Sequence, residues 1–264
     1  MASLRFTENE EIEMESDGAA ALRALDVLAQ RDPFIRANSV RWTPSSGALA
    51  DTAGVIRTDA GALIASGDVP EIARLIAQMD LGKLRFALTP IGTLEYAGDT
   101  MRDRFGLVDG GTWVWMHSRT LPPATPGEEH VSRLDGRFSE IAETIAESNP
   151  ETSAAEDIEE HEWWGYQRDG RLLGVCGIDN YGVQPGTPEG ARHGVHLSGL
   201  GTRPEARRQG VGAAMMAAIT RHFVGEFGLV HYGVWDTNHA ALRIYRRLGY
   251  STGAHIQNFV RGDS

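Results

Sequence analysis

The sequence predicts a mixed α/β protein with more than one domain. At 264 residues the chain is longer than a typical single domain. Its second half ends in alternating strand-like and helix-like segments, in the order β-α-β-α-β. A proline-rich segment at 119–130, RTLPPATPGEEH, lies between two better patterned halves and is typical of a linker. We therefore expect an N-terminal α/β domain at 1–125 and a second α/β domain at 126–264.

In the first half, an amphipathic helix is predicted to open near Asp68. Ile72, Leu75, Ile76 and Met79 recur at the spacing of one helix face. Further elements are expected as two strands in GVIRTDAGALIAS, a strand in LRFAL, a helix at 92–105 and a strand in GTWVWMHS.

The second half has a clearer pattern. We expect, in order, a strand in EEHVSRLDG, a helix in RFSEIAETIAES, a hairpin that turns at Asp169-Gly170, a strand at 194–200, a helix to about Phe223, a strand in LVHYGVW, a second helix, and a final strand in HIQNFV. Both halves thus share a weak strand-helix-strand-helix-strand order, which an ancient duplication would leave.

Composition excludes several classes of function. The net charge of −11 and the pI of about 5.3 argue against general binding to nucleic acid, itself an anion. Cys176 is the only cysteine, so an intrachain disulfide and a multi-cysteine metal site are excluded, and we expect a small buried residue there. The start of the chain lacks the features of a signal peptide, and no run approaches the ~20 apolar residues of a membrane span. We expect a cytoplasmic protein.

The segment RRQGVGAAMM, at 207–216, indicates a turn that could bind an anion. An apolar strand ends near Leu200, Pro204 blocks its continuation, and helix-favouring residues begin at Ala213. The first turn of a helix has N–H groups without intrahelical partners, and the helix dipole attracts anions to that end.

The residues of this turn suit a diphosphate. Gly210 and Gly212 lack the Cβ atoms that would keep a diphosphate from the backbone, and Arg207 and Arg208 add positive charge. The spacing matches neither a P-loop nor the dinucleotide-binding fingerprint. Taken alone, the segment is equally an ordinary helix start with permissive glycines.

A second segment, VWDTNHAALRIYRRLGY, favours the anion-binding interpretation. Its polar start supplies cap residues, its apolar residues form a helix stripe, and Gly249 is a good C-terminal stop. Together the two segments resemble the GNAT superfamily of acyl-CoA-dependent N-acyltransferases, over residues 130 to 262. The family's Arg/Gln-x-x-Gly-x-Gly/Ala loop is matched by Arg207, Gly210 and Gly212, and its Asn-x-x-Ala-x-x-x-Tyr-x-x-x-Gly-Phe/Tyr helix by Asn238, Ala241, Tyr245, Gly249 and Tyr250.

The resemblance implies a site for acetyl-CoA as co-substrate and no metal. The diphosphate would bind the loop amides, the pantetheine arm would pair with the strand before the loop, and Asn238 would contact that arm. The implied acyl-CoA-binding residues are Leu200, Thr202, Arg207, Arg208, Gln209, Gly210, Val211, Gly212, Ala213 and Asn238. The first half carries neither motif, and it could be a degenerate half of a tandem or glycine-acyltransferase-like member.

Two catalytic roles follow from the resemblance. Tyr245 matches a tyrosine that serves many relatives as general acid, although its ring also completes the apolar stripe. His196 stands where many relatives carry a glutamate that acts as the general base, and Thr202 stands where the family's strand pattern has valine. A neutral imidazole, with a pKa of about 6.5, suits proton removal near neutral pH; alternatively, His196 only forms a hydrogen bond within the sheet. His193 and His196 have the spacing of a metal pair, but on a strand they would face opposite sides, so we expect no zinc.

The sequence says less about the acceptor of the acyl group. The acidic run at 151–162 is either the border of a site for a cationic amine or a solvated helix face. The expected activity is transfer of an acetyl group from acetyl-CoA to a primary amine, on a small molecule or on a peptide N-terminus or lysine. The alternatives are an acyl-CoA-binding sensor without catalysis and an interaction module on the same scaffold. A homodimer is left open.

Overall fold

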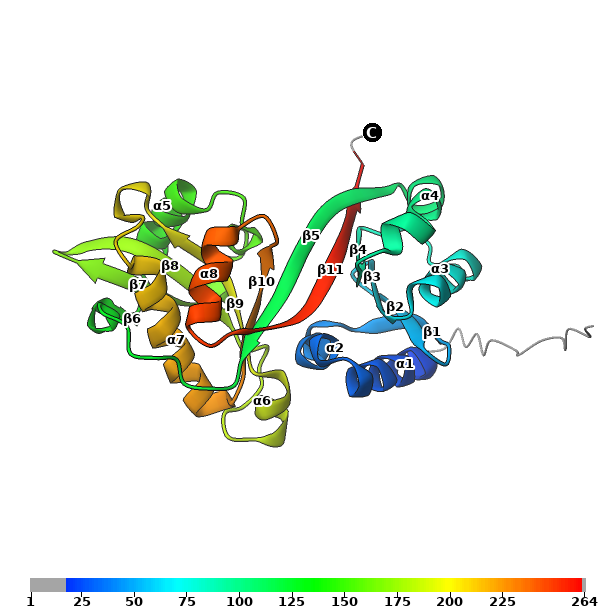
Figure 1. Ribbon diagram of the computed structural model, residues 1–264, viewed down its shortest axis with the longest axis horizontal. Helices are drawn as coiled ribbons and strands as arrows, with labels where there is room; N and C mark the ends of the chain where they lie inside the picture. Colours follow the sequence, from blue (N-terminus) through cyan, green and yellow to red (C-terminus); the bar gives the residue numbers. More distant parts are fainter. Residues whose placement is uncertain (1–17, 263–264) are drawn as a thin grey trace, which may run out of the picture. The chain divides into compact units, whose positions relative to one another are not determined.

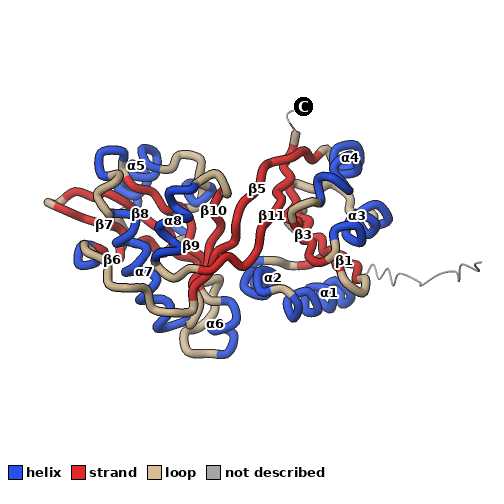
Figure 2. Tube along the Cα trace, in the orientation of Figure 1, coloured by secondary structure: helices blue, strands red, loops and turns tan. Residues whose placement is uncertain are grey.

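The computed structural model describes residues 18–262, which form two compact units (Figures 1 and 2). Of the described residues, the first unit takes 18–35, 42–111 and 256–262, and the second takes 36–41 and 112–255. Both units contain β-strands with helices packed on them, so the mixed α/β fold class is confirmed. The expected division of the chain near residue 125 stays a prediction. The start of the chain, where no signal peptide is expected, lies outside the described residues.

The first half of the chain opens with helices and continues as an antiparallel meander. Its elements are α1 (Gly18–Arg31), α2 (Pro33–Asn38), η1 (Ser39–Arg41), β1 (Pro44–Leu49), β2 (Ala53–Thr58), β3 (Ala62–Gly67), α3 (Val69–Gln78), β4 (Phe86–Pro90), α4 (Thr93–Phe105) and β5 (Leu107–Ser118). In the first unit, β1, β2 and β3 pair antiparallel, and β3 pairs parallel with β4 after the crossover through α3.

The helix α3 forms where the apolar spacing predicts it. The Asp68 side chain caps its first turn by accepting the N–H of Glu71 at 3.2 Å. Ile72, Leu75 and Ile76 are fully buried, in a core that also takes in residues of β2, β3 and α4. The amphipathic pattern therefore placed both the start of the helix and its buried face correctly.

The second half supplies most of the second unit. Its elements are η2 (Glu128–His130), β6 (Val131–Arg133), α5 (Phe138–Ser148), η3 (Ser153–Ala155), η4 (Ile158–Glu160), β7 (Glu162–Arg168), β8 (Arg171–Asp179), α6 (Pro188–His193), β9 (Val195–Thr202), η5 (Pro204–Ala206), α7 (Val211–Phe227), β10 (Val230–Trp235), α8 (His239–Arg247) and β11 (Ser251–Arg261). In space the strands of this unit follow the order β5-β10-β9-β8-β7-β6, and only β9 and β10 run parallel.

Two cores flank the sheet of the second unit. The helices α7 and α8 cover one face, and α5 covers the other (Figure 1). Most of α7 is buried, because its alanines and methionines are apolar on nearly every side. The smaller core joins α5 to Trp163 and Val175 on the opposite face. The hairpin between β7 and β8 turns at Asp169-Gly170 as predicted.

Both halves follow the same order of elements. β1-β2-β3-α3-β4-α4 in the first corresponds to β7-β8-β9-α7-β10-α8 in the second. The strand after the last helix pairs outside its own half in both cases. β5 pairs with β10 through residues 113–118, whereas β11 pairs with β4 through residues 256–260. Each unit thus contains a strand segment from the other half of the sequence, which the sequence pattern does not reveal.

Four of the α-helices and strands have no counterpart among the expected elements: α1, α2, β1 and the short helix α6. The strand β1, PSSGAL, has no β-branched or aromatic residue, and α6 has only six residues between two loops. Within residues 18–262, no helix is long and apolar enough to cross a membrane.

Candidate active site

The parallel strands β9 and β10 pair at one end and then separate. Their ladder has two pairs, Val230 with Val195 and His231 with His196. Beyond His231, β10 follows β5, whereas β9 follows β8. The facing backbone groups of the two strands can therefore pair with an extended ligand that carries amide groups. The pantetheine arm expected at this strand has that chemistry.

A β-bulge in β9 directs its last residues toward α7. Gly199 has φ +60°, and the ladder with β8 shifts register at this level. A Cβ atom at Gly199 would lie 3.0 Å from Ala154 and 3.1 Å from Trp163, so a larger residue would have to displace both. After the bulge, Leu200 packs against the α7 core, and the Thr202 hydroxyl lies 3.6 Å from where a Gly212 Cβ would be.

The backbone carbonyls of the predicted pantetheine-pairing residues have partners within the protein. The Leu200 carbonyl accepts the side-chain amide of Asn149 at 3.2 Å, and the Thr202 carbonyl accepts Arg207 Nε at 3.2 Å. Two hydroxyls near this strand, Ser148 Oγ and Ser198 Oγ, are buried and find no hydrogen-bond partner among the described residues. Buried hydroxyls without a hydrogen-bond partner cost stability.

The loop before α7 presents backbone N–H groups at an open surface. Gly210 caps the helix with φ +86°, and the first intrahelical bond runs from Ala214 N–H to the Gly210 carbonyl at 2.9 Å. The N–H groups of Val211, Gly212 and Ala213 therefore precede the helical ladder. A Cβ atom at Gly210 would meet no atom within 4 Å, so the space beside the loop is open to a ligand. This geometry fits a diphosphate at a helix N-terminus.

The polar side chains of the loop mostly hold its shape. Arg207 donates to the Thr202 carbonyl and, at 3.3 Å, to the Ser148 carbonyl. Gln209 donates to the Glu205 carbonyl at 2.7 Å, and its oxygen accepts a hydrogen bond from Arg168 at 2.6 Å. These two predicted binding residues brace the loop through their side chains.

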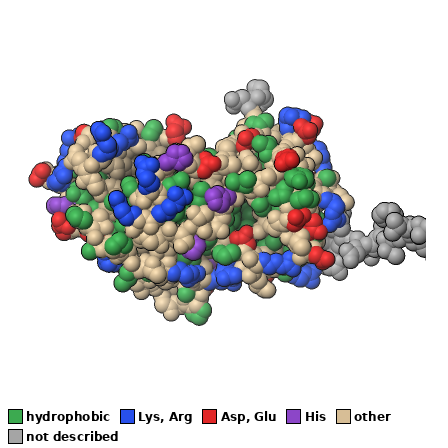
Figure 3. Space-filling view, in the orientation of Figure 1, with side chains coloured by type: hydrophobic (Ala, Val, Ile, Leu, Met, Phe, Trp, Pro, Cys, Tyr) green, Lys and Arg blue, Asp and Glu red, His purple; other side chains and the backbone are tan. Residues whose placement is uncertain are grey.

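Positive charge is available locally although the protein is acidic overall. Arg208 is exposed, with φ +62°, and no carboxylate in residues 18–262 pairs with it. Three further exposed arginines lie on α8, and Figure 3 shows basic side chains gathered there. They are Arg243, Arg246 and Arg247. A local basic surface can attract an anionic ligand to a protein whose net charge is −11.

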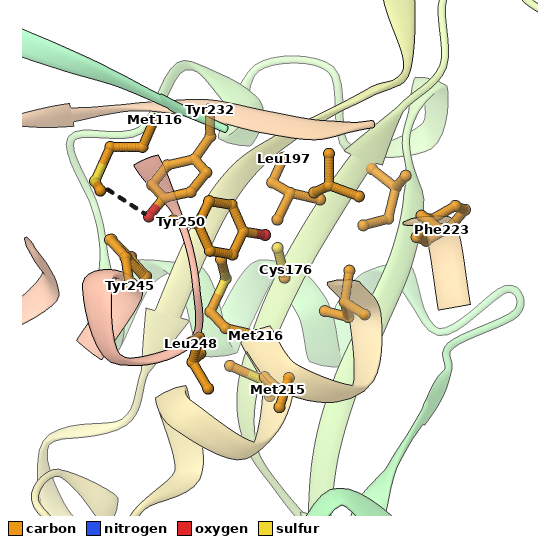
Figure 4. Close-up of a cluster of buried hydrophobic side chains, with 14 of the residues drawn as sticks. Met116, Cys176, Leu197, Met215, Met216, Phe223, Tyr232, Tyr245, Leu248 and Tyr250 are labelled. Atoms are coloured by element: carbon orange, nitrogen blue, oxygen red, sulfur yellow. Dashed lines mark hydrogen bonds between the residues drawn. The ribbon is translucent and has the colours of Figure 1, made fainter. Parts of the chain in front are cut away.

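Tyr245 lies in an aromatic cluster of the second unit. Its ring is 5% exposed and meets the Tyr232 ring edge-on, with centroids 4.6 Å apart. Tyr250 and Cys176 belong to the same core, as Figure 4 shows. Burial raises the pKa of the Tyr245 hydroxyl, so the group stays protonated and can donate a proton. Burial likewise raises the pKa of Cys176 to about 12, which makes its thiol unreactive.

Asn238 caps α8. Its side-chain oxygen accepts the N–H of Ala241 at 3.1 Å, and the residue is exposed. The capping interaction is typical of asparagine at a helix start. Its contact with the coenzyme arm stays a prediction, for which the side-chain NH₂ is the remaining donor.

His196 belongs to a polar row across four strands. In the sheet register Asp179 of β8 stands beside His196 of β9, His196 beside His231 of β10, and His231 beside His117 of β5. The His196 and His231 Nδ1 atoms are 3.4 Å apart, and Trp115 Nε1 donates to His231 Nδ1 at 3.2 Å. The predicted base is therefore one member of a connected group of rings.

The surroundings of His196 keep its imidazole neutral. Burial lowers its pKa well below the usual value, and Arg41, His231 and His161 lower it further. Arg41 lies over the Tyr181 ring at 4.9 Å, and that ring is 6.3 Å from the His196 ring. A neutral imidazole has the lone pair that a base needs, while the same surroundings disfavour the imidazolium.

His193 lies elsewhere than expected. It ends α6 instead of sharing β9 with His196, and its Nδ1 lies 2.9 Å from the Arg36 carbonyl. Gly194, at the end of α6, separates the two histidines into different elements. No group of three His, Cys, Asp or Glu residues within 18–262 could hold a metal ion.

The acidic run at 151–162 is not one helix face. It forms the short turns η3 and η4, and most of its side chains are exposed. Glu162 begins β7, and its carboxylate accepts the indole N–H of Trp164 at 2.7 Å. The run therefore offers charge near the start of β7 but no fixed constellation of carboxylates.

Sequence reasoning did not identify His231, His117 and Trp115 as neighbours of His196. Each lies in a segment that was correctly expected to be a strand. The alternation in VWMHS places Trp115 and His117 on one face, which was a usable signal. Which strand pairs with which, and in what register, cannot be read from either segment alone.

Comparisons with known proteins agree with this geometry. The family model described as "Acetyltransferase (GNAT) family" matches residues 132–250. An acetyltransferase of the GNAT family from Colwellia psychrerythraea is 14% identical, with 96% of this chain and 100% of that chain covered and a TM-score of 0.57. A protein from Drosophila is 15% identical, with 94% and 98% covered and a TM-score of 0.59. At these identities the solved structures show a shared fold. No curated protein matches the chain.

Proposed function

Because residues 132–250 match the family model of GNAT acetyltransferases, we propose that this protein transfers an acetyl group from acetyl-CoA to a primary amine. The observation that carries the proposal is the meeting of two features. The strands β9 and β10 separate after two pairs, and β9 leads through the bulge at Gly199 into the open N-terminus of α7. The space between the separated strands, which suits an extended arm with amide groups, thus leads to the N–H groups at the start of α7, which suit a diphosphate.

Each part of the donor would have its own contacts. The N–H groups at 208–213 bind the diphosphate, and Arg208 supplies charge. Arg207 and Gln209 hold the loop in shape through the hydrogen bonds described above. The backbone at Leu200 and Thr202 borders the arm, and Asn238 approaches it from α8. Bound acetyl-CoA supplies an activated thioester carbonyl.

The acyl transfer then needs two proton movements. The acceptor amine must lose a proton, because an ammonium has no lone pair with which to attack. His196 takes that proton as the new C–N bond forms, and Tyr245 gives a proton to the departing thiolate as the C–S bond breaks. The hydroxyl is protonated at neutral pH, as a proton donor must be, and burial raises its pKa and makes it a weaker acid than a free tyrosine.

The acceptor class is a primary amine on a small molecule, a peptide N-terminus or a lysine. A cytoplasmic location fits a chain whose single cysteine is buried, because disulfides are rare in reducing compartments. Both statements belong to the proposal.

Binding of the donor is the first test. At a concentration of acetyl-CoA 100 times its Kd, the protein should gain ~2.7 kcal/mol of stability. This corresponds to a rise in Tm of about 5–10 °C for a unit of this size. Turnover is then measured as thiol release against a panel of primary amines. Stabilisation without thiol release on any amine would favour a sensor instead, and no stabilisation would contradict the proposed donor.

Gly212→Glu tests where the donor binds. A Cβ atom at Gly212 would only touch Thr202 at 3.6 Å, so the substitution fits, and an acid in the first turn of a helix favours folding. The new carboxylate should repel the diphosphate and raise the Kd for acetyl-CoA by about 10- to 150-fold, the loss of 1.5–3 kcal/mol of charge-assisted hydrogen bonding. Gly225→Glu, at an exposed position of the same helix, is the matched control and should bind normally. Equal Kd values for both variants would place the diphosphate elsewhere.

A further inference from the structure

Three rings of the second unit form a chain of hydrogen-bonding atoms behind the proposed base. Trp115 lies on β5, His231 on β10 and His196 on β9. Trp115 and His231 are buried, with 2% and 0% of their surfaces exposed. The Trp115 Nε1 to His231 Nδ1 distance is 3.2 Å, and the His231 Nδ1 to His196 Nδ1 distance is 3.4 Å. Both contacts converge on one atom, His231 Nδ1.

The donor at one end fixes the proton on the middle ring. An indole N–H can only donate, so His231 Nδ1 must present its lone pair to Trp115. Burial lowers the pKa of His231 to about 3, so the ring is neutral and carries its single proton on Nε2. This Nε2 is buried and has no hydrogen-bond partner among the described residues, so the tautomer of His231 is set from the Nδ1 side.

The middle ring then fixes the proton on His196. Two Nδ1 atoms that face each other cannot both present lone pairs, and His231 Nδ1 is already an acceptor. His196 Nδ1 must therefore carry the hydrogen, which leaves the lone pair of the His196 ring on Nε2. An acceptor nitrogen shared between two donors makes longer bonds, and the two distances of 3.2 and 3.4 Å agree with sharing.

We propose that Trp115 and His231 are positioning residues that hold His196 in its Nδ1–H tautomer, so that Nε2 is the nitrogen that takes the proton of the acceptor amine. The use of Nε2 as base rests on the proposed acyl transfer, whereas the tautomer rests on the three rings alone. When Nε2 gains the proton, the Nδ1–H to His231 bond becomes charge-assisted and stabilises the imidazolium.

Other groups near His196 do not replace this arrangement. Arg41 and His161 act on it through charge, and the neighbouring Tyr181 ring contributes contact. Asp179 stands beside His196 in the register, but its carboxylate accepts the N–H of Tyr181 at 2.9 Å. The His196 ring makes its hydrogen-bond contact with His231, at 3.4 Å.

Nitrogen NMR reads the tautomer directly. The full chain, with ¹⁵N-labelled histidine, is studied at pH 7.5 by long-range ¹H–¹⁵N correlation, and the signals are assigned with His196→Gln and His231→Gln. We expect a protonated Nδ1 for His196 and a protonated Nε2 for His231. A His196 signal with the proton on Nε2 would overturn the inference. Because this measurement needs no turnover, such a failure would leave the proposed acyl transfer untouched.

Trp115→Phe tests the positioning. The variant keeps an aromatic ring but removes the N–H, so His231 can change tautomer and His196 should show a mixture. With a working amine, kcat should fall by about 3- to 10-fold, the value of one neutral hydrogen bond, while the KM for acetyl-CoA stays unchanged. Trp164→Phe removes another indole donor of the same unit and should leave the His196 signal unchanged. An unaltered His196 tautomer in Trp115→Phe would refute the positioning role. Absent turnover with the expected wild-type pattern would instead refute the proposed function and the use of Nε2 as base.

Discussion

Arg203→Met should destabilise the protein by about 1.5–3 kcal/mol, a cost set by burial and not by the number of ion pairs. Arg203 follows β9, and its side chain is only 6% exposed. It forms ion pairs with Glu143, at 3.3 Å, and with Glu147, both on α5. It also donates to the Leu172 carbonyl at 3.0 Å and to the Thr144 hydroxyl at 3.2 Å. Arg203 thus connects α5 to the start of the loop before α7.

The magnitude follows from these four contacts. The side chains of Glu143 and Glu147 are 66% and 44% exposed, so water solvates both after the substitution and the two ion pairs contribute ~0–1 kcal/mol together. The Thr144 hydroxyl keeps its bond to the Glu140 carbonyl at 2.7 Å. The main loss is the charged hydrogen bond to the Leu172 carbonyl, about 1.5–2 kcal/mol. Methionine preserves most of the apolar stem.

Arg102→Met is the matched control. Arg102 also pairs with two carboxylates, Asp99 and Asp103, each at 2.8 Å, but its side chain is 57% exposed. Its replacement should change the free energy of unfolding by less than ~1 kcal/mol. Urea unfolding of the full chain, followed by circular dichroism, measures both variants. Equal effects, or an Arg203→Met change within ~0.5 kcal/mol, would refute the argument from burial.

Three further outcomes are expected. Tyr245→Phe should lower kcat about 100-fold without altering the aromatic packing. Tyr250→Phe also removes a buried hydroxyl but should leave kcat unchanged. Equal kcat values for the two variants would exclude Tyr245 as the general acid. Deletion of residues 1–125 removes β5 and unpairs β10, so the remainder should be insoluble; a soluble, fully active remainder would contradict a supporting role for the first half. His231 has its pKa lowered to about 3, so it stabilises the fold above pH 6.5, and this contribution is lost as the pH falls toward 3. His231→Gln should therefore flatten the loss of stability over that range by up to ~1.4 kcal/mol per pH unit, and an unchanged slope measured by urea unfolding would contradict the buried neutral ring.

Local patterns predicted the elements well where one physical cause acts within a short segment. The apolar stripe and the Asp68 cap define α3, and the Asp169-Gly170 turn defines the β7–β8 hairpin. Pairing across long sequence separations was not predictable. The partner of β5 is β10 and that of β11 is β4, and nothing in either strand's residues distinguishes these partners from nearer ones.

The same distinction holds within the candidate site. Gly210 and Gly212 act through the backbone at the start of one helix. Their separation in the sequence therefore fixes their positions relative to each other. His196 was predicted as a base from the resemblance to the GNAT family, but its neighbour His231 follows 35 residues later and joins it only through parallel register. The bulge at Gly199 adds a second difficulty, because it reverses the side to which Leu200 and Thr202 point.

The donor and acceptor sides consequently respond differently to substitution. The proposed diphosphate site consists mainly of backbone N–H groups at the start of α7, and substitutions that keep glycine at 210 and 212 should preserve it. The proposed acceptor side takes its side chains from separate segments: His196 from β9, Tyr181 from the loop after β8, and Arg41, which lies over the Tyr181 ring, from η1. Changes at Tyr181 should therefore alter which amine is used while leaving the Kd for acetyl-CoA intact. A screen of amines that varies this position alone separates recognition of the acceptor from binding of the donor.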